Sequence, residues 1–413
     1  MRVLWFEISI PSRYENVKVP TMGWQDSLQE IVMKCPQIEL AIAFEGKSGM
    51  HIKEFDGVKY YPLIPKTSLY ERKVGINMDR WCMAKKLIPL ATKVVDDYKP
   101  DVIHVFGTEW TFGQVAKFTT IPIVIHMQGC VAAYNNALYP PMYSNIDSII
   151  QAGLNIKKQF KLWMNRKYIS TWENMELDNF KAVSYYMGRT NWDKNLVELF
   201  HPGAKYFYCS EALRPTFIEN VIYWKPSYNK KIRLITTGCG SHWKGMDTVL
   251  RSARILKQHN IDFEWLLVGN LCNDFRKELE MKEKCKFSDV FIKVMGYTNA
   301  DELKNILLSS DIYIHTAYID NSPNSICEAQ YLGLPLIATY VGGVPSIVEN
   351  GKEGLLVPAN APFTLASEII KLSKDIERQK MYSEATRKKA RERHKPETIL
   401  NDLINCYKTL LTK

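Results

Sequence analysis

The stretch "DIYIHTAYIDNSPNSICEAQYLGLPLIATY", residues 311–340, contains two apolar strand candidates joined by a segment that starts like a helix. Ser322 is of a type preferred at the N-cap and Pro323 is preferred at the first helical position, so we expect the helix to begin there. Strands as uniformly apolar as DIYIHTA and LPLIATY are typical of a parallel sheet that helices cover on both faces. The stretch therefore predicts an α/β fold.

The same strand–helix unit recurs along the chain. In the second half, apolar runs stand at 232–238, 263–269, 290–296, 311–317 and 334–340, and the first three end in glycine. Looser runs in the first half stand at 2–10, 38–44, 101–107 and 121–127. Ligand-binding turns of such sheets lie at the carboxyl ends of the strands, so these glycines mark candidate binding turns. We expect two doubly wound, Rossmann-like domains.

A chain of 413 residues is long enough for two such domains. We expect an N-terminal domain over residues 1–215 and a C-terminal domain over 216–395, with the Pro- and Lys-containing stretch 223–231 as the candidate linker. Residues 396–413 predict one more helix, and its apolar face needs a surface to pack on. That face consists of Ile399, Leu400, Leu403, Tyr407, Leu410 and Leu411.

The composition favours a cytoplasmic protein with reduced thiols. Its nine cysteines include no C-x-x-C pair, which argues against both a disulfide framework and a zinc site. The N-terminus resembles a first strand more than a signal peptide, and no apolar run approaches the ~20 residues that span a bilayer. Lys and Arg outnumber Asp and Glu by 54 to 44, which suits an anionic ligand, an acidic membrane or nucleic acid without choosing among them.

Two acidic residues flank the start of the helix expected near Pro323. Asp320 precedes it and Glu328 lies about a turn and a half inside, while the amides of Asn324 and Ser325 have no intrahelical acceptor. Helix N-termini bind phosphates and polar oxygens, and carboxylates bind vicinal hydroxyls. One site for an extended polar ligand would use all four groups; the alternative is a capped helix with two solvated acids.

A second motif, "GCGSHWKGMDTVLRSARILK" at residues 238–257, follows a strand and leads into a helix. Its turn carries Gly238, Gly240, Gly245 and Lys244, a combination typical of a phosphate-binding turn. It matches neither the P-loop nor the dinucleotide fingerprint, so its specificity alone is moderate. We also consider His242 a candidate phosphate contact.

Together these segments resemble a known family. Residues 320–358, "DNSPNSICEAQYLGLPLIATYVGGVPSIVENGKEGLLVP", look like the signature of the family 4 retaining glycosyltransferases of GT-B fold, in which an acid, seven residues and a Glu precede a Gly-x-Pro segment. With the turn at 238–245, the resemblance covers residues 230–395. It implies two domains facing a cleft, a C-terminal domain that binds a nucleotide-sugar, an N-terminal domain that binds the acceptor, and a last helix that crosses back to the N-terminal domain.

The resemblance also implies roles for individual residues. Glu328 would bind the ribose hydroxyls, Asp320 the hydroxyls of the donor sugar and Lys244 the diphosphate, and these three are the candidate catalytic set. The further candidates for donor binding are Gly238, Gly240, His242, Gly296, Tyr297, Asn324 and Ser325. Of these, Gly296 and Tyr297 would lie beside the base of the nucleotide.

This sequence departs from the family at two positions. Asp320 stands where the family usually has Glu, and Cys239 stands where it usually has Arg. A missing cation beside a leaving diphosphate needs replacement, because such charge-assisted contacts contribute several kcal/mol in a closed site. We expect Arg189, in "YYMGRTNWDK", to reach across the cleft to the phosphates; the alternative is a surface arginine that caps a helix.

Three residues of the N-terminal half are acceptor-side candidates: Glu109 in "GTEW", and His126 and Gln128 in "HMQG". The family commonly has a His near the latter turn, but alignment on Pro122 places Gln128 there. For His126, and equally for His104, the alternative is a buried, hydrogen-bonded histidine at a strand end.

The stretch 148–170 mixes apolar and aromatic residues with lysines and arginines. A basic helix of this kind is a candidate for resting on an anionic membrane, here beside a lipid-linked acceptor. The alternative is a core helix with a solvated basic face.

We therefore expect a retaining glycosyltransferase that transfers a sugar from a nucleotide-diphosphate donor, by default a UDP-sugar, to a saccharide or lipid-linked saccharide of a surface polysaccharide. No D-x-D motif occurs, so a metal held by such a motif is not expected. No cofactor is expected either. The protein would be cytoplasmic, peripheral at the inner face of the membrane, and without a nucleic-acid partner. The alternatives are a nucleotide-sugar epimerase of GT-B fold and a non-catalytic nucleic-acid-binding protein.

Overall fold

A computed structural model describes residues 1–15, 23–73, 79–219, 221–227 and 231–412. The chain forms two compact units, and each is built from separate stretches of sequence. The first unit comprises residues 1–132, 163–212 and 395–413, and the second comprises 133–162 and 213–394. In the parts of the chain just given, no helix has the length and apolar character needed to cross a membrane.

These units differ in two respects from the division expected at residue 215. The segment 133–162 belongs to the second unit although it lies far upstream of that boundary. The linker expected at 223–231 is wrong for its described part, because Trp224 is buried in the second unit and its Nε1–H donates to the Ser310 carbonyl at 2.7 Å. Residues 228–230 of that stretch lie outside the described residues.

The first unit has an eight-stranded sheet in the order β3-β4-β2-β1-β5-β6-β7-β8. All its pairs are parallel except β3 with β4, which is antiparallel. Its strands are β1 (Arg2–Glu7), β2 (Glu39–Glu45), β3 (Lys53–Phe55), β4 (Val58–Leu63), β5 (Val102–Phe106), β6 (Ile123–His126), β7 (Tyr185–Gly188) and β8 (Lys205–Tyr208).

Helices cover both faces of this sheet. They are α1 (Trp24–Met33), α3 (Arg80–Tyr98), η2 (Thr111–Lys117), α7 (Asn191–Phe200) and α16 (Pro396–Leu411). The short helix α2 (Leu69–Lys73) follows β4 and exposes its apolar side chains. The chain passes between the units within α4 (Val131–Asn136) and α6 (Ile156–Ala182). One core packs α3, η2, α6 and α7 on the sheet, and the other packs α1 and α16.

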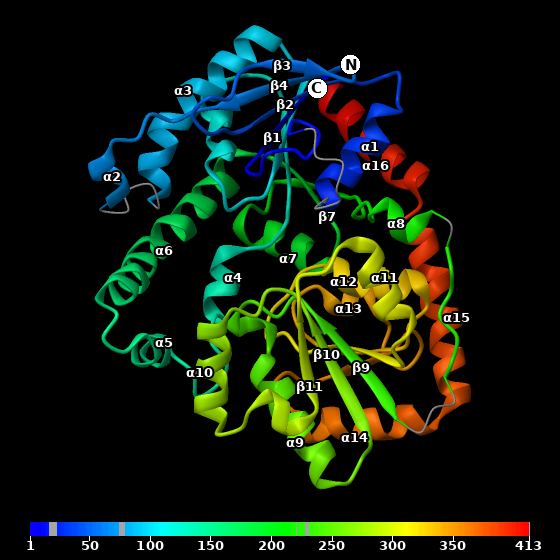
Figure 1. Cartoon of the computed structure of the whole chain (residues 1–413). Coiled ribbons are helices and arrows are strands. Elements are labelled where there is room, and N and C mark those ends of the chain that lie inside the picture. The colour runs from blue at the N-terminus through cyan, green and yellow to red at the C-terminus, as the bar shows by residue number, and fades with distance from the viewer. Residues whose placement is uncertain (16–22, 74–78, 220, 228–230, 413) are drawn as a thin grey trace. The chain divides into compact units, whose positions relative to one another are not determined.

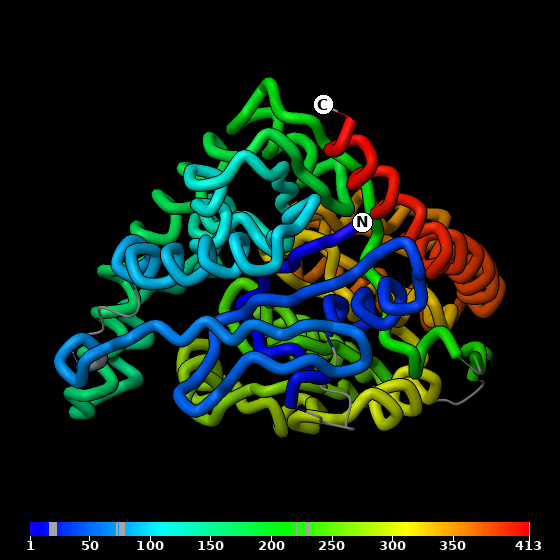
Figure 2. The backbone as a smooth tube through the Cα atoms, turned by 90° about the horizontal axis from the view of Figure 1, so that it is seen from above, coloured from blue at the N-terminus to red at the C-terminus, as the bar shows by residue number. Residues whose placement is uncertain are grey.

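Helix α16 is the expected last helix, and it completes the first unit. Tyr407 is buried, and its hydroxyl accepts from Trp5 Nε1 at 3.1 Å and contacts His104 Nδ1 at 2.6 Å. The expected apolar face is buried at Ile399, Leu403 and Leu410, whereas Leu411 is exposed. The blue and red ends of the tube in Figure 2 therefore trace segments of one unit.

The second unit has a six-stranded, all-parallel sheet in the order β11-β10-β9-β12-β13-β14. Its strands are β9 (Ile232–Thr237), β10 (Phe263–Val268), β11 (Ile292–Gly296), β12 (Ile312–His315), β13 (Leu336–Thr339) and β14 (Leu355–Val357). This is the Rossmann order, and the direction of winding reverses between β9 and β12.

The helices of the second unit again form two layers, visible around β9 to β11 in Figure 1. They are α5 (Asn145–Ala152), α8 (Pro215–Ile218), η3 (His242–Lys244), α9 (Met246–Gln258), α10 (Asn273–Glu283), η4 (Phe287–Val290), α11 (Ala300–Leu308), α12 (Asn324–Leu332), α13 (Val344–Ile347), α14 (Pro362–Lys374) and α15 (Ile376–Arg393). One core joins α9, α10 and α14 to the sheet, and the other joins α8, α11, α12 and α13. The α/β prediction and all nine strand candidates are confirmed.

Candidate functional site

The two sequence motifs meet at the switch point of the second sheet. The loop 238–245 leaves the carboxyl end of β9, and the loop 316–323 leaves that of the neighbouring β12. Thr316 Oγ1 donates to the main-chain oxygen of Lys244 at 3.0 Å. Gly245 has φ +73°, and a Cβ there would lie 2.0 Å from the Thr316 carbonyl oxygen. Only glycine therefore lets these loops approach, and ligands of doubly wound sheets bind at this position.

Asp320 is the centre of the polar contacts in this site. Its Oδ2 accepts from Lys244 Nζ at 2.6 Å and from His315 Nε2 at 3.0 Å, and its Oδ1 accepts from the Tyr134 hydroxyl at 3.4 Å. Burial alone would raise the pKa of this carboxyl, but the Lys244 charge and the His315 contact outweigh it and lower the pKa. Asp320 is therefore an ionised carboxylate that holds a lysine in place.

Glu328 is also buried, and Arg214 binds both of its oxygens. Arg214 Nε and Nη2 donate to the two carboxylate oxygens at 2.7 and 2.8 Å. Burial raises the pKa of Glu328, and the Arg214 contact only partly offsets this. The alternative of two solvated acids is wrong, because Asp320 is 6% and Glu328 4% exposed.

Helix α12 begins one residue later than expected. It starts at Asn324, with Pro323 as the N-cap and no side-chain cap. Ser322 therefore does not cap it, and its hydroxyl accepts instead from Arg393 Nη2 at 3.3 Å. In the described chain, no hydrogen bond from the Asn324 or Ser325 amide is found, so both are available to a ligand.

The cysteine at the position of the family's arginine adds no positive charge. Cys239 is buried, and burial raises the pKa of its thiol to about 11, so the thiol is neutral. Two arginines of the second unit instead lie beside α12, namely Arg214 on Glu328 and Arg393 on Ser322.

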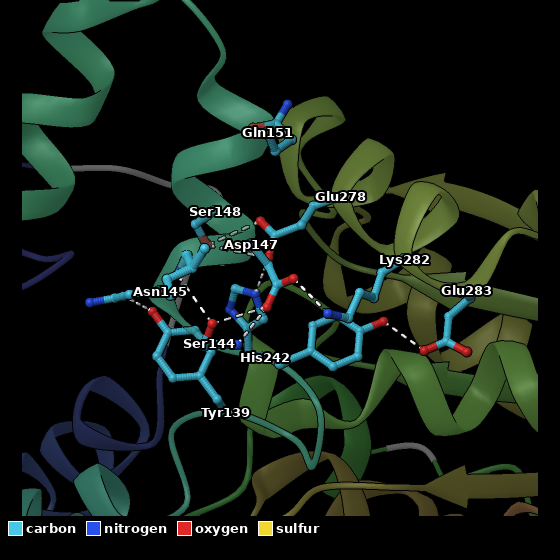
Figure 3. A network of polar contacts seen from close by, with 12 residues as sticks. Tyr139, Ser144, Asn145, Asp147, Ser148, Gln151, His242, Glu278, Lys282 and Glu283 are labelled. Carbon is cyan, nitrogen blue, oxygen red and sulfur yellow. Dashed lines mark hydrogen bonds and ion pairs between the residues drawn. The ribbon is translucent and has the colours of Figure 1, made fainter.

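His242 has a different environment from the one expected. Its Nε2 lies 2.7 Å from Glu278 Oε1, and its ring centroid lies 4.9 Å from that of Tyr139 and 4.5 Å from that of Phe275. Glu278 also accepts from the Ser148 hydroxyl. Figure 3 shows this network, in which His242 joins the phosphate turn to α5 and α10. The observed contacts give His242 a structural role through its Nε2 atom.

The residues expected at the base lie at the same carboxyl edge of the sheet. Gly296 ends β11 with φ +77°, and its carbonyl accepts from the Gly269 amide at 2.8 Å. Tyr297 follows and is 68% exposed, so its ring is available to stack on a base.

The acceptor-side candidates lie in the first unit, after β5 and β6. Burial and the like charge of Glu176 raise the pKa of Glu109 to about 8, against the opposing effect of Arg80 and Arg189. Both ring nitrogens of His126 are buried, neither has a hydrogen-bond partner in the described part of the chain, and burial lowers the pKa of the ring. His104 is buried in the middle of β5, where burial lowers its pKa to about 3. The alternative of a buried, hydrogen-bonded histidine therefore fits His104, whose Nδ1 contacts the Tyr407 hydroxyl, whereas His126 shares only the burial.

Arg189 is not the surface arginine of the alternative, since it is 3% exposed. Its guanidinium carbon lies 4.8 Å from the centroid of the Trp24 ring, and Nη2 donates to the carbonyls of Met127 and Gln128 at 3.3 and 3.5 Å. Its amide donates to the Asp193 carboxylate at 2.8 Å. Arg189 thus lies at the carboxyl edge of the first sheet.

Four residues of the candidate site were not anticipated: Tyr134, Arg214, His315 and Arg393. A signal existed for His315, because it ends the strand that leads to Asp320. Arg214 and Arg393 stand in segments with no motif, and Tyr134 lies in the first half of the chain, so only the tertiary structure reveals them.

Residues 223–389 match the sequence model of a family described as "Glycosyl transferases group 1". These residues are thus similar to the group 1 glycosyl transferases, which agrees with the resemblance to a glycosyltransferase over this region. Among curated proteins, the amylovoran biosynthesis glycosyltransferase AmsK of Erwinia amylovora is 22% identical over 44% of this chain and 45% of its own length. The chain thus spans about half the length of this relative.

Solved structures match nearly the whole chain. The sucrose-phosphate synthase of Thermosynechococcus elongatus superposes with a TM-score of 0.72 at 12% identity and covers 100% of this chain and 99% of its own. The Anabaena protein Alr3699/HepE, in complex with UDP and glucose, superposes with a TM-score of 0.65 at 15% identity, covering 99% and 100%. The fold is therefore GT-B, with two Rossmann-like units, as expected.

Proposed function

We propose that the protein is a glycosyltransferase that moves a sugar from a nucleotide-diphosphate donor, a UDP-sugar, to an acceptor hydroxyl. The observation that carries this proposal is the convergence of Asp320, Lys244 and the free amides of α12 at the switch point of the second sheet. The carboxylates of Asp320 and Glu328 can accept hydrogen bonds from sugar and ribose hydroxyls. Lys244 and the amides can donate to the phosphates, so the site offers partners for both parts of a nucleotide-sugar. The UDP complex of the Anabaena neighbour supports the choice of base.

In the present structure Lys244 and Asp320 neutralise each other. A bound diphosphate competes with Asp320 for the Lys244 ammonium, and the hydroxyls of the donor sugar take the place of that ammonium on Asp320. Lys244 thus changes its partner from Asp320 to the diphosphate, and Asp320 changes its partner from Lys244 to the sugar hydroxyls. Donor binding then costs no unpaired charge, because each group leaves one partner only when it gains another.

Three groups would stabilise the departing diphosphate: Lys244, the amides at the start of α12, and one of the arginines beside that helix. Arg214 is the better candidate of the two. Once ribose hydroxyls donate hydrogen bonds to Glu328, this carboxylate no longer depends on Arg214, and the guanidinium can turn to the diphosphate. We propose that transfer proceeds without a metal and with retention, and that Asp320 positions the sugar and does not attack it. The family resemblance supports retention.

The proposed acceptor is a growing or lipid-linked surface polysaccharide; the Erwinia relative is named for amylovoran biosynthesis. Its proposed site is the carboxyl edge of the first sheet, near Glu109 and Gln128.

Helix α5 and the start of α6 would rest on the membrane. Exposed apolar side chains at 146, 149, 150, 154 and 156 adjoin exposed Lys157 and Lys161, which is the composition of a membrane-contacting surface.

The test is a thermal-shift screen against UDP, GDP, ADP and their sugars, since a ligand that binds the native state raises the melting temperature. We expect UDP to raise it and the Lys244→Met variant to lose most of this shift. The control is Lys389→Met, which removes a lysine paired to buried Glu353 elsewhere in the same unit. Proton NMR of the donor with and without acceptor then follows the anomeric signal; an epimer formed from donor alone, or no shift with any nucleotide, contradicts the proposal.

A further inference from the structure

Arg80 is a buried cation of the first unit that the donor site does not use. It is the first residue of α3 and is 8% exposed. Its guanidinium carbon lies 4.2 Å from the centroid of the Trp110 ring and 3.8 Å from that of Trp172. The two rings are tilted by 51° with centroids 5.3 Å apart, so they form a corner that holds the guanidinium. Rings contact a guanidinium through its flat face, which leaves its N–H edge for other partners.

The N–H edge of the Arg80 guanidinium is not fully hydrogen-bonded. Arg80 Nε is buried and has no hydrogen-bond partner, and among the residues described no carboxylate lies within ion-pair distance of Arg80. Two other arginines that lie over rings do have a carboxylate partner: Arg2, over Tyr98, binds Glu39, and Arg214, over Phe217, binds Glu328. A buried guanidinium with an unused donor is unfavourable unless a ligand supplies the acceptor.

The acids around Arg80 do not supply it. Glu45, at the end of β2, and Glu109, after β5, interact with Arg80 only through their electrostatic field. Burial raises the pKa of both carboxyls, that of Glu109 to about 8, so Glu109 is protonated at neutral pH. The Glu109 Oε2 atom is itself buried and has no hydrogen-bond partner among the described residues. An anion near Arg80 therefore meets a neutral hydrogen-bonding acid and not a second negative charge.

We propose that Arg80, Trp110, Trp172 and Glu109 form a subsite for an anionic sugar, in which Arg80 binds its carboxylate or phosphate and the half-buried rings contact its apolar face. The subsite lies at the carboxyl edge of the first sheet, where strands β2 and β5 end. It rests on the proposed function in one respect, because it makes the acceptor of that reaction an acidic saccharide. The planar fork of an arginine matches the two oxygens of either group.

The experiment measures binding of three probes to the full chain by saturation-transfer NMR titration: D-glucuronate, D-glucose 6-phosphate and D-glucose. We expect one or both anions to bind at least tenfold more tightly than glucose, and the anion that binds identifies the group as carboxylate or phosphate. Equal binding of glucose, or no binding of either anion, overturns the proposal.

Two variants of Arg80 make the result specific. Arg80→Met should weaken anion binding at least tenfold, and Arg80→Lys should weaken it by a smaller factor, because lysine keeps the charge but not the fork. Arg2→Met is the matched control, since it removes an arginine that also lies over a ring, and it should bind the anions like the parent. Should Arg80→Met fail to fold, Arg80→Lys and Trp172→Phe carry the test, and unchanged anion binding in both overturns the proposal.

A pH series provides an independent readout. Above pH 8 Glu109 ionises, so anion binding by the parent should fall several-fold between pH 7 and pH 9, while Glu109→Gln removes this dependence. The UDP screen is run on the same samples. UDP binding without anion binding overturns only this inference, whereas anion binding without any nucleotide binding contradicts the proposed function and leaves the subsite in place.

Discussion

Replacing Asp320 by Asn should make the protein bind UDP more tightly while it abolishes sugar transfer. In the structure the Asp320 carboxylate occupies Lys244, whose side chain is 27% exposed, through a charge-assisted hydrogen bond of 2.6 Å. Such a bond between two charged groups contributes up to about 3 kcal/mol, whereas the bond of the ammonium to a neutral amide lies at the lower end of the charge-assisted range, about 1.5 kcal/mol. The amide therefore competes with the diphosphate less strongly by about 1–1.5 kcal/mol, which corresponds to about fivefold to tenfold tighter binding.

The assay is isothermal titration of UDP into the parent and the variant at pH 7.5, followed by turnover of the UDP-sugar. The matched control is Glu353→Gln, which removes another buried carboxylate of the second unit that is paired to a lysine, Lys389, at 3.0 Å. This control should bind UDP like the parent. UDP affinity that is equal or lower in Asp320→Asn would refute the idea that Lys244 is exchanged between Asp320 and the diphosphate.

Three further outcomes are expected. Arg214→Met should destabilise the protein by about 3 kcal/mol in chemical unfolding, because it leaves buried Glu328 unpaired, and the double variant with Glu328→Gln should recover much of this loss. The free energy of unfolding should fall as pH rises from about 4 to 8, by up to about 1.4 kcal/mol per pH unit, because folded Glu109 keeps a proton that the unfolded chain has released; Glu109→Gln should remove this slope. Lys157→Glu with Lys161→Glu should reduce flotation with acidic vesicles several-fold and leave UDP binding unchanged.

Each of these predictions has a result that contradicts it. If Arg214→Met is as stable as the parent, the Glu328 carboxyl takes up a proton at no cost and the pair is not a stabilising contact. If the slope with pH is the same in Glu109→Gln, another group carries it. The vesicle experiment uses Lys388→Glu, in α15, as its control, and equal flotation of all variants removes the membrane proposal.

The second unit could be predicted from the sequence almost completely. Its buried parallel strands are uniformly apolar, and each glycine turn marks a strand end. Asp320 and Lys244 were found from the spacing of the motifs, because both loops follow neighbouring strands of the sheet. The pairing of each acid with its base was not predicted, since side-chain contacts across a sheet leave no pattern in sequence.

The first unit was predicted less well, for two different reasons. The hairpin of β3 and β4 turns at Asp56 and Gly57, which have φ of 50° and 74°, so an Asp-Gly turn signal was present in the sequence and was overlooked. The assignment of 133–162 to the second unit had no such signal. It depends on contacts such as that of the Tyr143 hydroxyl with Glu283 at 2.8 Å, between residues 140 positions apart.

The packing of α16 on β1 constrains the order in which parts of the protein can fold during synthesis. Trp5 donates a hydrogen bond to Tyr407, which is synthesised 402 residues later, so this contact cannot form until then. At about 5–20 residues per second this interval lasts roughly 20–80 s, during which the apolar face of β1 that α16 will cover stays open. Residues 213–394 can fold within that interval with 133–162, which have already emerged. The second unit can therefore be complete before α16 covers β1.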